Sequence, residues 1–135
     1  MRVIMIQAAC VAVGSIFGGL LRWGVGVSFA NWFGTAFPWG TFFINLSGSM
    51  FLGWFTTIIT ERLMGGAATW IGADNLRLMI AVGFTGAYTT FSTFEYESNE
   101  LVRNGESLKA MAYILGSVAL GLLAVRLGMM LARKM

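Results

Sequence analysis

GFTGAYTTFSTFEYE, residues 83–97, interrupts a long apolar run with two glycines, five threonines or serines and two glutamates. Thr and Ser side chains compete for the backbone hydrogen bonds of a helix, and Gly loosens it. We therefore predict a helix break near residues 86–90 that leaves backbone carbonyls without intrahelical partners. Inside a membrane such a break is tolerated only where it is buried in protein or lines a site for ions or water. A kinked but inert packing helix is the alternative.

The composition around this stretch is that of an integral membrane protein. Hydrophobic residues make up 57% of the 135 positions and charged residues 11%, and the mean hydropathy is +0.75. Soluble domains, in contrast, are about 25% charged. A bilayer core about 30 Å thick requires roughly 20 apolar residues per helix. We therefore predict a single all-α transmembrane domain over residues 1–135, with four helices at 3–27, 40–60, 77–101 and 108–132.

The remaining segments read as membrane-surface connectors. Residues 28–39 carry no charge but hold two Trp residues and Pro38, which we expect to start the second helix. Residues 61–76 mix charges with a Gly65-Gly66 pair and Trp70. With four spans, both termini and the second connector lie on one side of the membrane.

The basic residues favour a cytoplasmic location for the termini. Six lie on the side of the termini and three on the other, and cytoplasmic loops carry an excess of Lys and Arg. The six are Arg2, Arg62, Arg77, Arg126, Arg133 and Lys134, and the three are Arg22, Arg103 and Lys109. The net charge of +3 therefore reflects loops facing anionic lipid, and we expect no nucleic-acid partner.

Small and polar residues within the other spans have two readings. The pairs Gly14 and Gly18, Ser49 and Gly53, and Ser117 and Gly121 are spaced at i, i+4, which favours close packing between helix backbones. Asn45 either bonds a neighbouring helix or lines a pathway, and Arg22 either extends to the interface or attracts an anion. Amide, guanidinium and hydroxyl donors together suit a path for an anion.

Three motifs resemble those of the Fluc (CrcB) family of fluoride channels. TTFSTF at 89–94, preceded by GFTG at 83–86, is similar to the family's third-helix signature. GGLLRW at 18–23 and GTFFINLSG at 40–48 are similar to its first- and second-helix motifs. The resemblance implies a dual-topology homodimer of two antiparallel copies that cross at the helix break. It also implies two pores that export fluoride passively across the bacterial inner membrane and so protect the cell from its toxicity.

The resemblance also implies roles for individual residues. The fluoride pore would be lined by Asn45, Phe91, Phe94, Ser92, Thr93, Thr41, Tyr113 and Ser117. Arg22 and Glu97 match vestibule positions. Gly86 and Thr89 match positions whose main-chain carbonyls, two from each subunit, hold a central structural sodium ion.

This chain departs from the family pattern at three places. Ala87-Tyr88 adds bulk beside the break, Glu95 adds a carboxylate, and Gly121 replaces a serine of the polar track. The competing hypotheses are a small proton-coupled multidrug exporter and a non-conducting structural subunit. The exporter needs a carboxylate in its first span, and residues 3–27 contain none. An enzyme is not expected, because the chain has no His and its single Cys has no basic partner.

Overall fold

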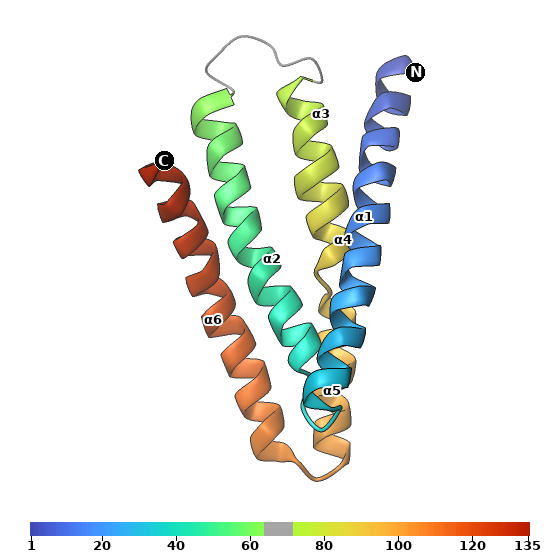
Figure 1. The fold of residues 1–135 in the computed structure, drawn as a ribbon, viewed down its shortest axis with the longest axis vertical. Helices are drawn as coiled ribbons and strands as arrows, with labels where there is room; N and C mark the ends of the chain where they lie inside the picture. Colours follow the sequence, from blue (N-terminus) through green and yellow to red (C-terminus); the bar gives the residue numbers. More distant parts are fainter. Residues whose placement is uncertain (64–71) are drawn as a thin grey trace.

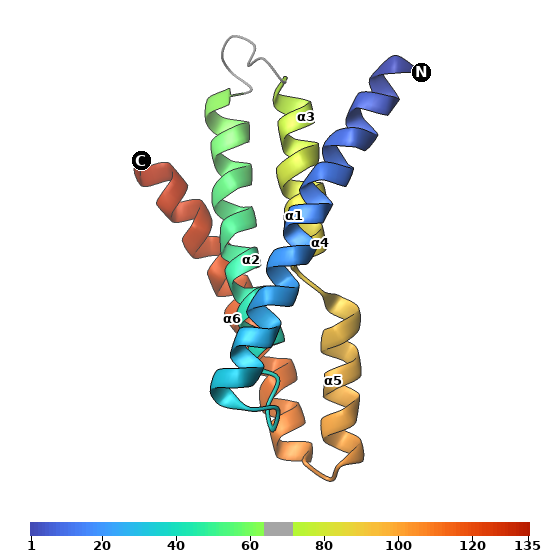
Figure 2. The ribbon, with the colours of Figure 1, turned by 45° about the vertical axis from the view of Figure 1, so that its right-hand side comes forward.

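The computed structural model describes residues 1–63 and 72–135 as a set of long helices (Figures 1 and 2). Residues 64–71, with Gly65, Gly66 and Trp70 of the second predicted connector, lie outside the described residues. The elements are α1 (Arg2–Phe33), α2 (Trp39–Ile58), η1 (Ile59–Leu63), α3 (Ala73–Arg77), η2 (Leu78–Thr85), α4 (Gly86–Tyr88), α5 (Phe91–Arg103) and α6 (Ser107–Lys134), of which η1 and η2 are π-helical.

The predicted multi-pass helical architecture is confirmed. Among the described residues, α1, α2 with its extension to Glu61, and α6 are each long and apolar enough to cross a membrane. The predicted third crossing, residues 77–101, is instead divided, because α3, η2 and α4 follow one another to Tyr88 and α5 starts only at Phe91. Both termini lie at the same end of the molecule, opposite the turn between α5 and α6 (Figure 1). The protein is therefore a multi-pass membrane protein.

The helix break lies at Thr89 and Thr90, inside the predicted range. Thr89 has φ −78° and ψ 159°, and Thr90 has φ −150° and ψ 122°. Both residues are extended, whereas Gly86 still has the helical values φ −63° and ψ −35°. Figure 2 shows the chain passing from α4 to α5 through this short extended segment.

The prediction that residues 28–39 form a connector was wrong for residues 28–33. Residues 28–33 continue α1, because the stretch SFANWF contains neither Gly nor Pro to end a helix. Gly34 ends it instead, with φ +73°, a conformation that favours glycine. α2 starts directly after Pro38, as expected, and the N–H of Phe42 donates to the Pro38 carbonyl at 3.0 Å.

Glycines bring the helix backbones into direct contact, as the small-residue spacing predicts. A Cβ atom at Gly14 would overlap the carbonyl oxygen of Met79, and one at Gly18 would overlap that of Phe84. α1 therefore packs directly on η2. The i, i+4 prediction is also confirmed at Gly53, where a Cβ atom would overlap a carbonyl of α6, at Val125.

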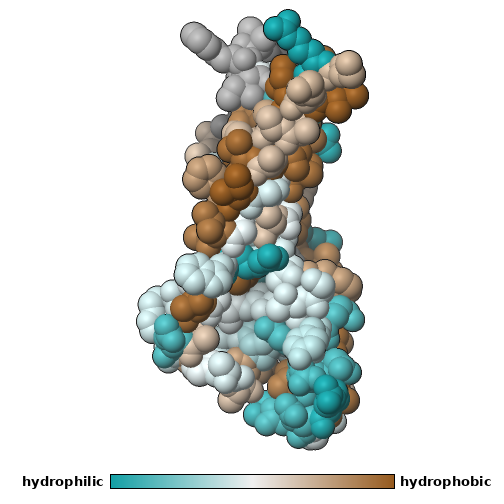
Figure 3. Space-filling model, turned by 90° about the vertical axis from the view of Figure 1, so that its right-hand side faces the viewer, coloured by the Kyte–Doolittle hydropathy of each residue, from teal (hydrophilic) through white to brown (hydrophobic). Residues whose placement is uncertain are grey.

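The surface divides along the length of the molecule. Figure 3 shows hydrophobic side chains over the upper part of one face and hydrophilic ones gathered at the lower end, at the level of α5.

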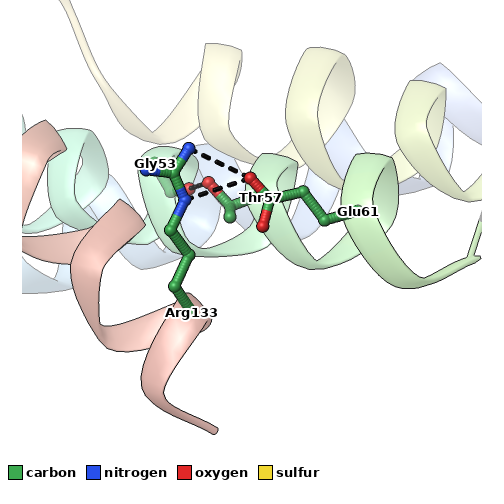
Figure 4. Close-up of polar contacts among 4 residues, drawn as sticks. All are labelled: Gly53, Thr57, Glu61 and Arg133. Atoms are coloured by element: carbon green, nitrogen blue, oxygen red, sulfur yellow. Dashed lines mark hydrogen bonds and ion pairs between the residues drawn. The ribbon is translucent and has the colours of Figure 1, made fainter.

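At the end opposite to α5, an ion pair joins α6 to η1 through the Arg133 side chain. Its Nε and Nη2 atoms both lie 3.0 Å from Oε1 of Glu61, one turn beyond Thr57 (Figure 4).

Candidate functional site

α2 holds the break through the side chain of Asn45. Its Nδ2 donates to the carbonyl of Thr90 at 3.0 Å, and its Oδ1 accepts from the N–H of Thr90 at 2.9 Å. A single amide thereby satisfies both backbone groups of an extended residue, as a neighbouring strand would. One hydrogen of Nδ2 remains beyond the one given to Thr90, because a carboxamide carries two donors. Asn45 is thus a structural clamp that keeps a spare donor.

Thr90 caps the second half-helix. Its Oγ1 accepts from the N–H of Thr93 at 3.3 Å and donates to Oγ1 of Thr93 at 3.0 Å, while Oγ of Ser92 lies 3.5 Å away. The hydroxyls of the predicted track therefore meet at the start of α5. Thr90 was missed as a site residue, although a threonine before a new helical segment is itself a sequence signal for an N-cap.

Two of these hydrogen bonds, from the N–H of Thr90 to Asn45 and from the N–H of Thr93 to the Thr90 hydroxyl, leave carbonyl oxygens at the break without donors. In a continuous helix the N–H of Thr90 would bond the Gly86 carbonyl and that of Thr93 would bond the Thr89 carbonyl. Here the first N–H goes to Asn45 and the second to the Thr90 hydroxyl. The Gly86 and Thr89 carbonyls have therefore both lost their helical donors. Oxygen atoms of this kind are suitable ligands for a hard cation, so the residues present fit the sodium ion that the resemblance implies.

A cavity of about 220 Å³ adjoins the break. It brings residues of α2 together with residues on both sides of the interruption. Its lining is Asn45, Gly48, Ser49, Leu52, Thr85, Thr89, Thr90 and Phe91. The predicted Asn45, Thr89 and Phe91 thus share one cavity, which combines amide, hydroxyl and carbonyl groups with an aromatic ring.

A second group forms around Glu97, in the lower part of the molecule. Thr41 donates to Oε1 of Glu97 and Tyr113 donates to its Oε2, each at 2.8 Å. The three residues come from α2, α5 and α6, and Tyr113 is fully buried. Thr41 and Glu97 also line a larger cavity of about 350 Å³ that lies between the end of α1, the residues before α2 and α5. The structure therefore joins one predicted vestibule residue to two predicted pore residues.

The two predicted pore phenylalanines lie on different faces of α5. Phe94 is 7% exposed and meets the ring of Tyr113 edge to face, with centroids 5.1 Å apart. Phe91 is 73% exposed, although its ring centroid is only 6.0 Å from that of Phe94. One ring belongs to the interior of this chain, and the other projects from it.

The remaining predicted residues are placed as follows. The Oγ atom of Ser117 is buried and has no hydrogen-bond partner among the residues that the structure describes. It lies one helical turn beyond Tyr113 on α6. Arg22 is half-buried on α1, lines neither of the two cavities and makes no ion pair within the described ranges. The structure thus places Arg22 outside both the residues around the break and the residues bonded to Glu97.

The fold and the site define a class of protein. It is a small multi-pass α-helical membrane protein in which an interrupted crossing exposes backbone carbonyls, hydroxyls and an amide beside aromatic rings. A sequence model of the family described as CrcB-like protein, Camphor Resistance (CrcB), matches residues 9–129.

Curated relatives match nearly the whole chain. The fluoride-specific ion channel FluC of Chloroflexus aurantiacus is 44% identical over 91% of this chain and 92% of its own length. The proteins with that name from Synechococcus sp. and Nitrobacter winogradskyi are 42% and 39% identical over 91% of this chain, and over 89% and 92% of their own lengths. The chain belongs to the CrcB family. These relatives are named as channels and not as enzymes, in agreement with the expectation drawn from the sequence.

Proposed function

We propose that this protein is a fluoride-selective channel that lets fluoride leave the cell passively across the bacterial inner membrane. The observation that carries the proposal is the 44% identity, over 91% of the chain, to a relative named as a fluoride-specific ion channel. The polar break at Thr89 and Thr90 supports it, because irregular backbone at membrane depth is tolerated where it lines a pathway or is buried in protein.

The side chains around the break suit a small, strongly hydrated anion. Removing water from fluoride requires hydrogen-bond donors close to the ion. Asn45 has a donor beyond its bond to Thr90, and the buried hydroxyl of Ser117 has no described partner. Phenyl rings carry a positive edge, which Phe91 and Phe94 would present to the ion while excluding water. Ser92 and Thr93 belong to the proposed track as well. So do Thr41 and Tyr113, whose single hydroxyl hydrogens go to Glu97 in the absence of an ion.

We further propose that two copies assemble in antiparallel orientation. The face of α5 that bears Phe91, Ser92, Glu95 and Asn99 is exposed in one chain, and polar groups exposed to hydrocarbon are costly. A second copy placed over this face would bury Phe91 and bring the two breaks together.

Dual insertion is testable with Asp74→Cys, an exposed position on α3, in a Cys10→Ser background. Labelling from both sides of the membrane is expected, and labelling from one side only would contradict the antiparallel pair.

A sodium ion between the two copies would complete the assembly. Gly86 and Thr89 would hold it through their main-chain carbonyls, both of which have lost their helical donors. Such an ion supplies positive potential midway along two anion pathways. No carboxylate is needed for this role, and the predicted ligands are uncharged oxygens.

Arg22 and Glu97 would act at the vestibule. We expect Arg22 to concentrate anions rather than to select among them, so Arg22→Gln should lower flux most at low ionic strength, where screening is weakest. Glu97, held by Thr41 and Tyr113, would orient these two hydroxyls. Unchanged flux of Arg22→Gln in low salt would assign Arg22 to the membrane interface instead.

The decisive experiment is efflux from liposomes. Purified protein in vesicles loaded with fluoride should release fluoride, and not chloride, once a potassium ionophore sets the membrane potential. Equal release of both ions would contradict selectivity. No release from vesicles that contain folded protein would contradict conduction and favour a structural subunit.

A further inference from the structure

α2 holds the break at a second point, on the other side from Asn45. The hydroxyl of Tyr88, the last residue of α4, lies 2.8 Å from Oγ of Ser47. Tyr88 is 7% exposed, and its ring stacks on Phe84 with centroids 6.1 Å apart and an interplanar angle of 10°. Tyr88 belongs to the Ala87-Tyr88 departure from the family pattern, and neither Tyr88 nor Ser47 was among the predicted site residues.

The direction of this hydrogen bond follows from the other contacts of Ser47. Its Oγ also lies 2.7 Å from the Phe43 carbonyl and 3.2 Å from the Ile44 carbonyl. A carbonyl only accepts, and a serine hydroxyl has a single hydrogen to give. Ser47 therefore donates to its own helix and accepts from Tyr88. The tyrosine hydroxyl depends on Ser47 for its acceptor, whereas the serine hydroxyl keeps a partner without the tyrosine.

The backbone of α2 fits closely against the residues that follow. A Cβ atom at Gly48 would overlap Cγ2 of Thr89 and would lie 3.2 Å from Cδ1 of Tyr88. Asn45 then takes both backbone groups of Thr90. Three consecutive residues of the interrupted crossing, 88, 89 and 90, are thus seated on one short segment of α2, residues 45–48.

We propose that Ser47 and Tyr88 are positioning residues for conduction. Their hydrogen bond fixes where α4 ends, so that Thr89 turns to the extended conformation at the place where Asn45 can hold Thr90. Without it, among the described residues, α2 keeps hydrogen bonds to residues 88–90 only through Asn45, on the α5 side of the break. The released carbonyls of Gly86 and Thr89 then lose their fixed positions relative to each other. The part of this inference that concerns conduction rests on the proposed function.

A double-mutant cycle in the full-length protein tests the pair. Ser47→Ala should lower the fluoride efflux rate about tenfold, because it removes the bond and leaves a buried phenol without an acceptor. Tyr88→Phe removes the same bond but leaves no unpaired group, so its loss should be smaller, about threefold. The double variant should match Tyr88→Phe, which means that removing the phenol partly rescues Ser47→Ala. Ser47→Thr, which keeps the hydroxyl, should retain the wild-type rate.

The matched control is Ser28→Ala on α1. The Ser28 hydroxyl donates to the Gly24 carbonyl at 2.8 Å, as Ser47 does within α2, but no tyrosine depends on it. Ser28→Ala should leave both efflux and thermal stability in detergent unchanged. If Ser47→Ala behaves like Ser28→Ala, or if the effects of Ser47→Ala and Tyr88→Phe simply add, the positioning role is wrong and only ring packing holds Tyr88.

Thermal stability measured for the same variants separates this inference from the proposed function. Wild-type protein that releases no fluoride would refute the channel. The double-mutant cycle measured by melting temperature would still test the hydrogen bond between Ser47 and Tyr88. Wild-type protein that conducts, together with additive effects on both efflux and melting temperature, would refute the positioning pair alone.

Discussion

Two parts of the molecule are stabilised in different ways. In the glycine-packed scaffold, formed by α1, α2, η2 and α6, helix backbones touch directly at Gly14, Gly18 and Gly53. α5 has no such glycine contact among the described residues. It contacts α6 through the buried side chains of Phe94 and Leu101, and its Glu97 accepts hydrogen bonds from Thr41 and Tyr113. Its other face, with Phe91, is exposed.

The difference shows which part is complete within one chain. Lipid tails are as apolar as the side chains of the scaffold, so direct backbone contact and dispersion, rather than exclusion of water, hold its helices together. α5 instead has exposed hydroxyls and carboxylates, and inside a membrane each polar group would require a partner. The close backbone contacts of the scaffold are all made within one chain, whereas the face of α5 that carries Phe91 is exposed. The two parts should therefore respond differently to substitution.

The largest effect is expected from a substitution that separates α1 from η2. Gly18→Ala would place its Cβ against the Phe84 carbonyl and close to the N–H of Tyr88, which forces the two helices apart. Overpacking of this kind typically costs about 1–3 kcal/mol. We expect little folded protein, measured as the yield of monodisperse protein and its melting temperature in detergent.

Gly19→Ala is the matched control for this prediction. A Cβ atom there would meet no atom within 4 Å, and Ala favours a helix over Gly by about 1 kcal/mol. Gly19→Ala should therefore be neutral or stabilising. Equal behaviour of the two variants would contradict the close contact between α1 and η2.

The next effect concerns the connection between the two parts. Asn45→Asp keeps an acceptor for the N–H of Thr90 but replaces the donor to the Thr90 carbonyl by a charged oxygen. That oxygen faces a carbonyl, and in the proposed pore it also repels an anion. Fluoride efflux should fall by at least about tenfold. Full efflux from folded Asn45→Asp would exclude Asn45 from both the clamp and the pore.

Substitutions at the two phenylalanines of α5 should affect stability and conduction differently. Phe94→Ile removes a ring packed on Tyr113 and should lower the free energy of unfolding by about 1–3 kcal/mol as well as the efflux rate. Phe91→Ile changes an exposed ring, so it should spare the folding of a single chain. It should still reduce efflux about tenfold by removing an aromatic edge. If Phe91→Ile conducts normally, the exposed face of α5 does not line the pore.

The general architecture could be predicted from the sequence because it depends on local composition. Apolar runs located the crossings, and the threonines and glycines of residues 83–97 located the break. The extension of α1 to Phe33 was missed, because membrane thickness limits the apolar part of a helix but does not end it. The spacing of small residues indicated the scaffold contacts, since small side chains let helix backbones approach closely.

The partners within the site could not be predicted in the same way. Asn45 was expected to serve a pathway or a neighbouring helix, but its bonds to Thr90 depend on how α2 is rotated against α5. Ser47 and Tyr88 are 41 positions apart, and no local pattern joins them. The predicted roles of Arg22, Phe91, Ser117 and the sodium ligands stay predictions, because they concern an ion or a second copy rather than contacts within one chain.

The smallest effect is expected at the scaffold's far end, where Arg133 contacts Glu61 (Figure 4). The two side chains are 57% and 46% exposed, and ion pairs at this level of exposure contribute about 0–1 kcal/mol. Glu61→Gln should therefore change the free energy of unfolding by less than about 0.5 kcal/mol, and Arg133→Gln should do the same. Both variants should conduct normally, because neither residue contacts the break. The measurement is a double-mutant cycle of unfolding in detergent at low and high salt, since an exposed pair is weakened by screening. A salt-independent coupling above about 1 kcal/mol would mean that the assembled protein shields this pair from water. This end of the scaffold would then, like the exposed face of α5, be covered only in the assembly.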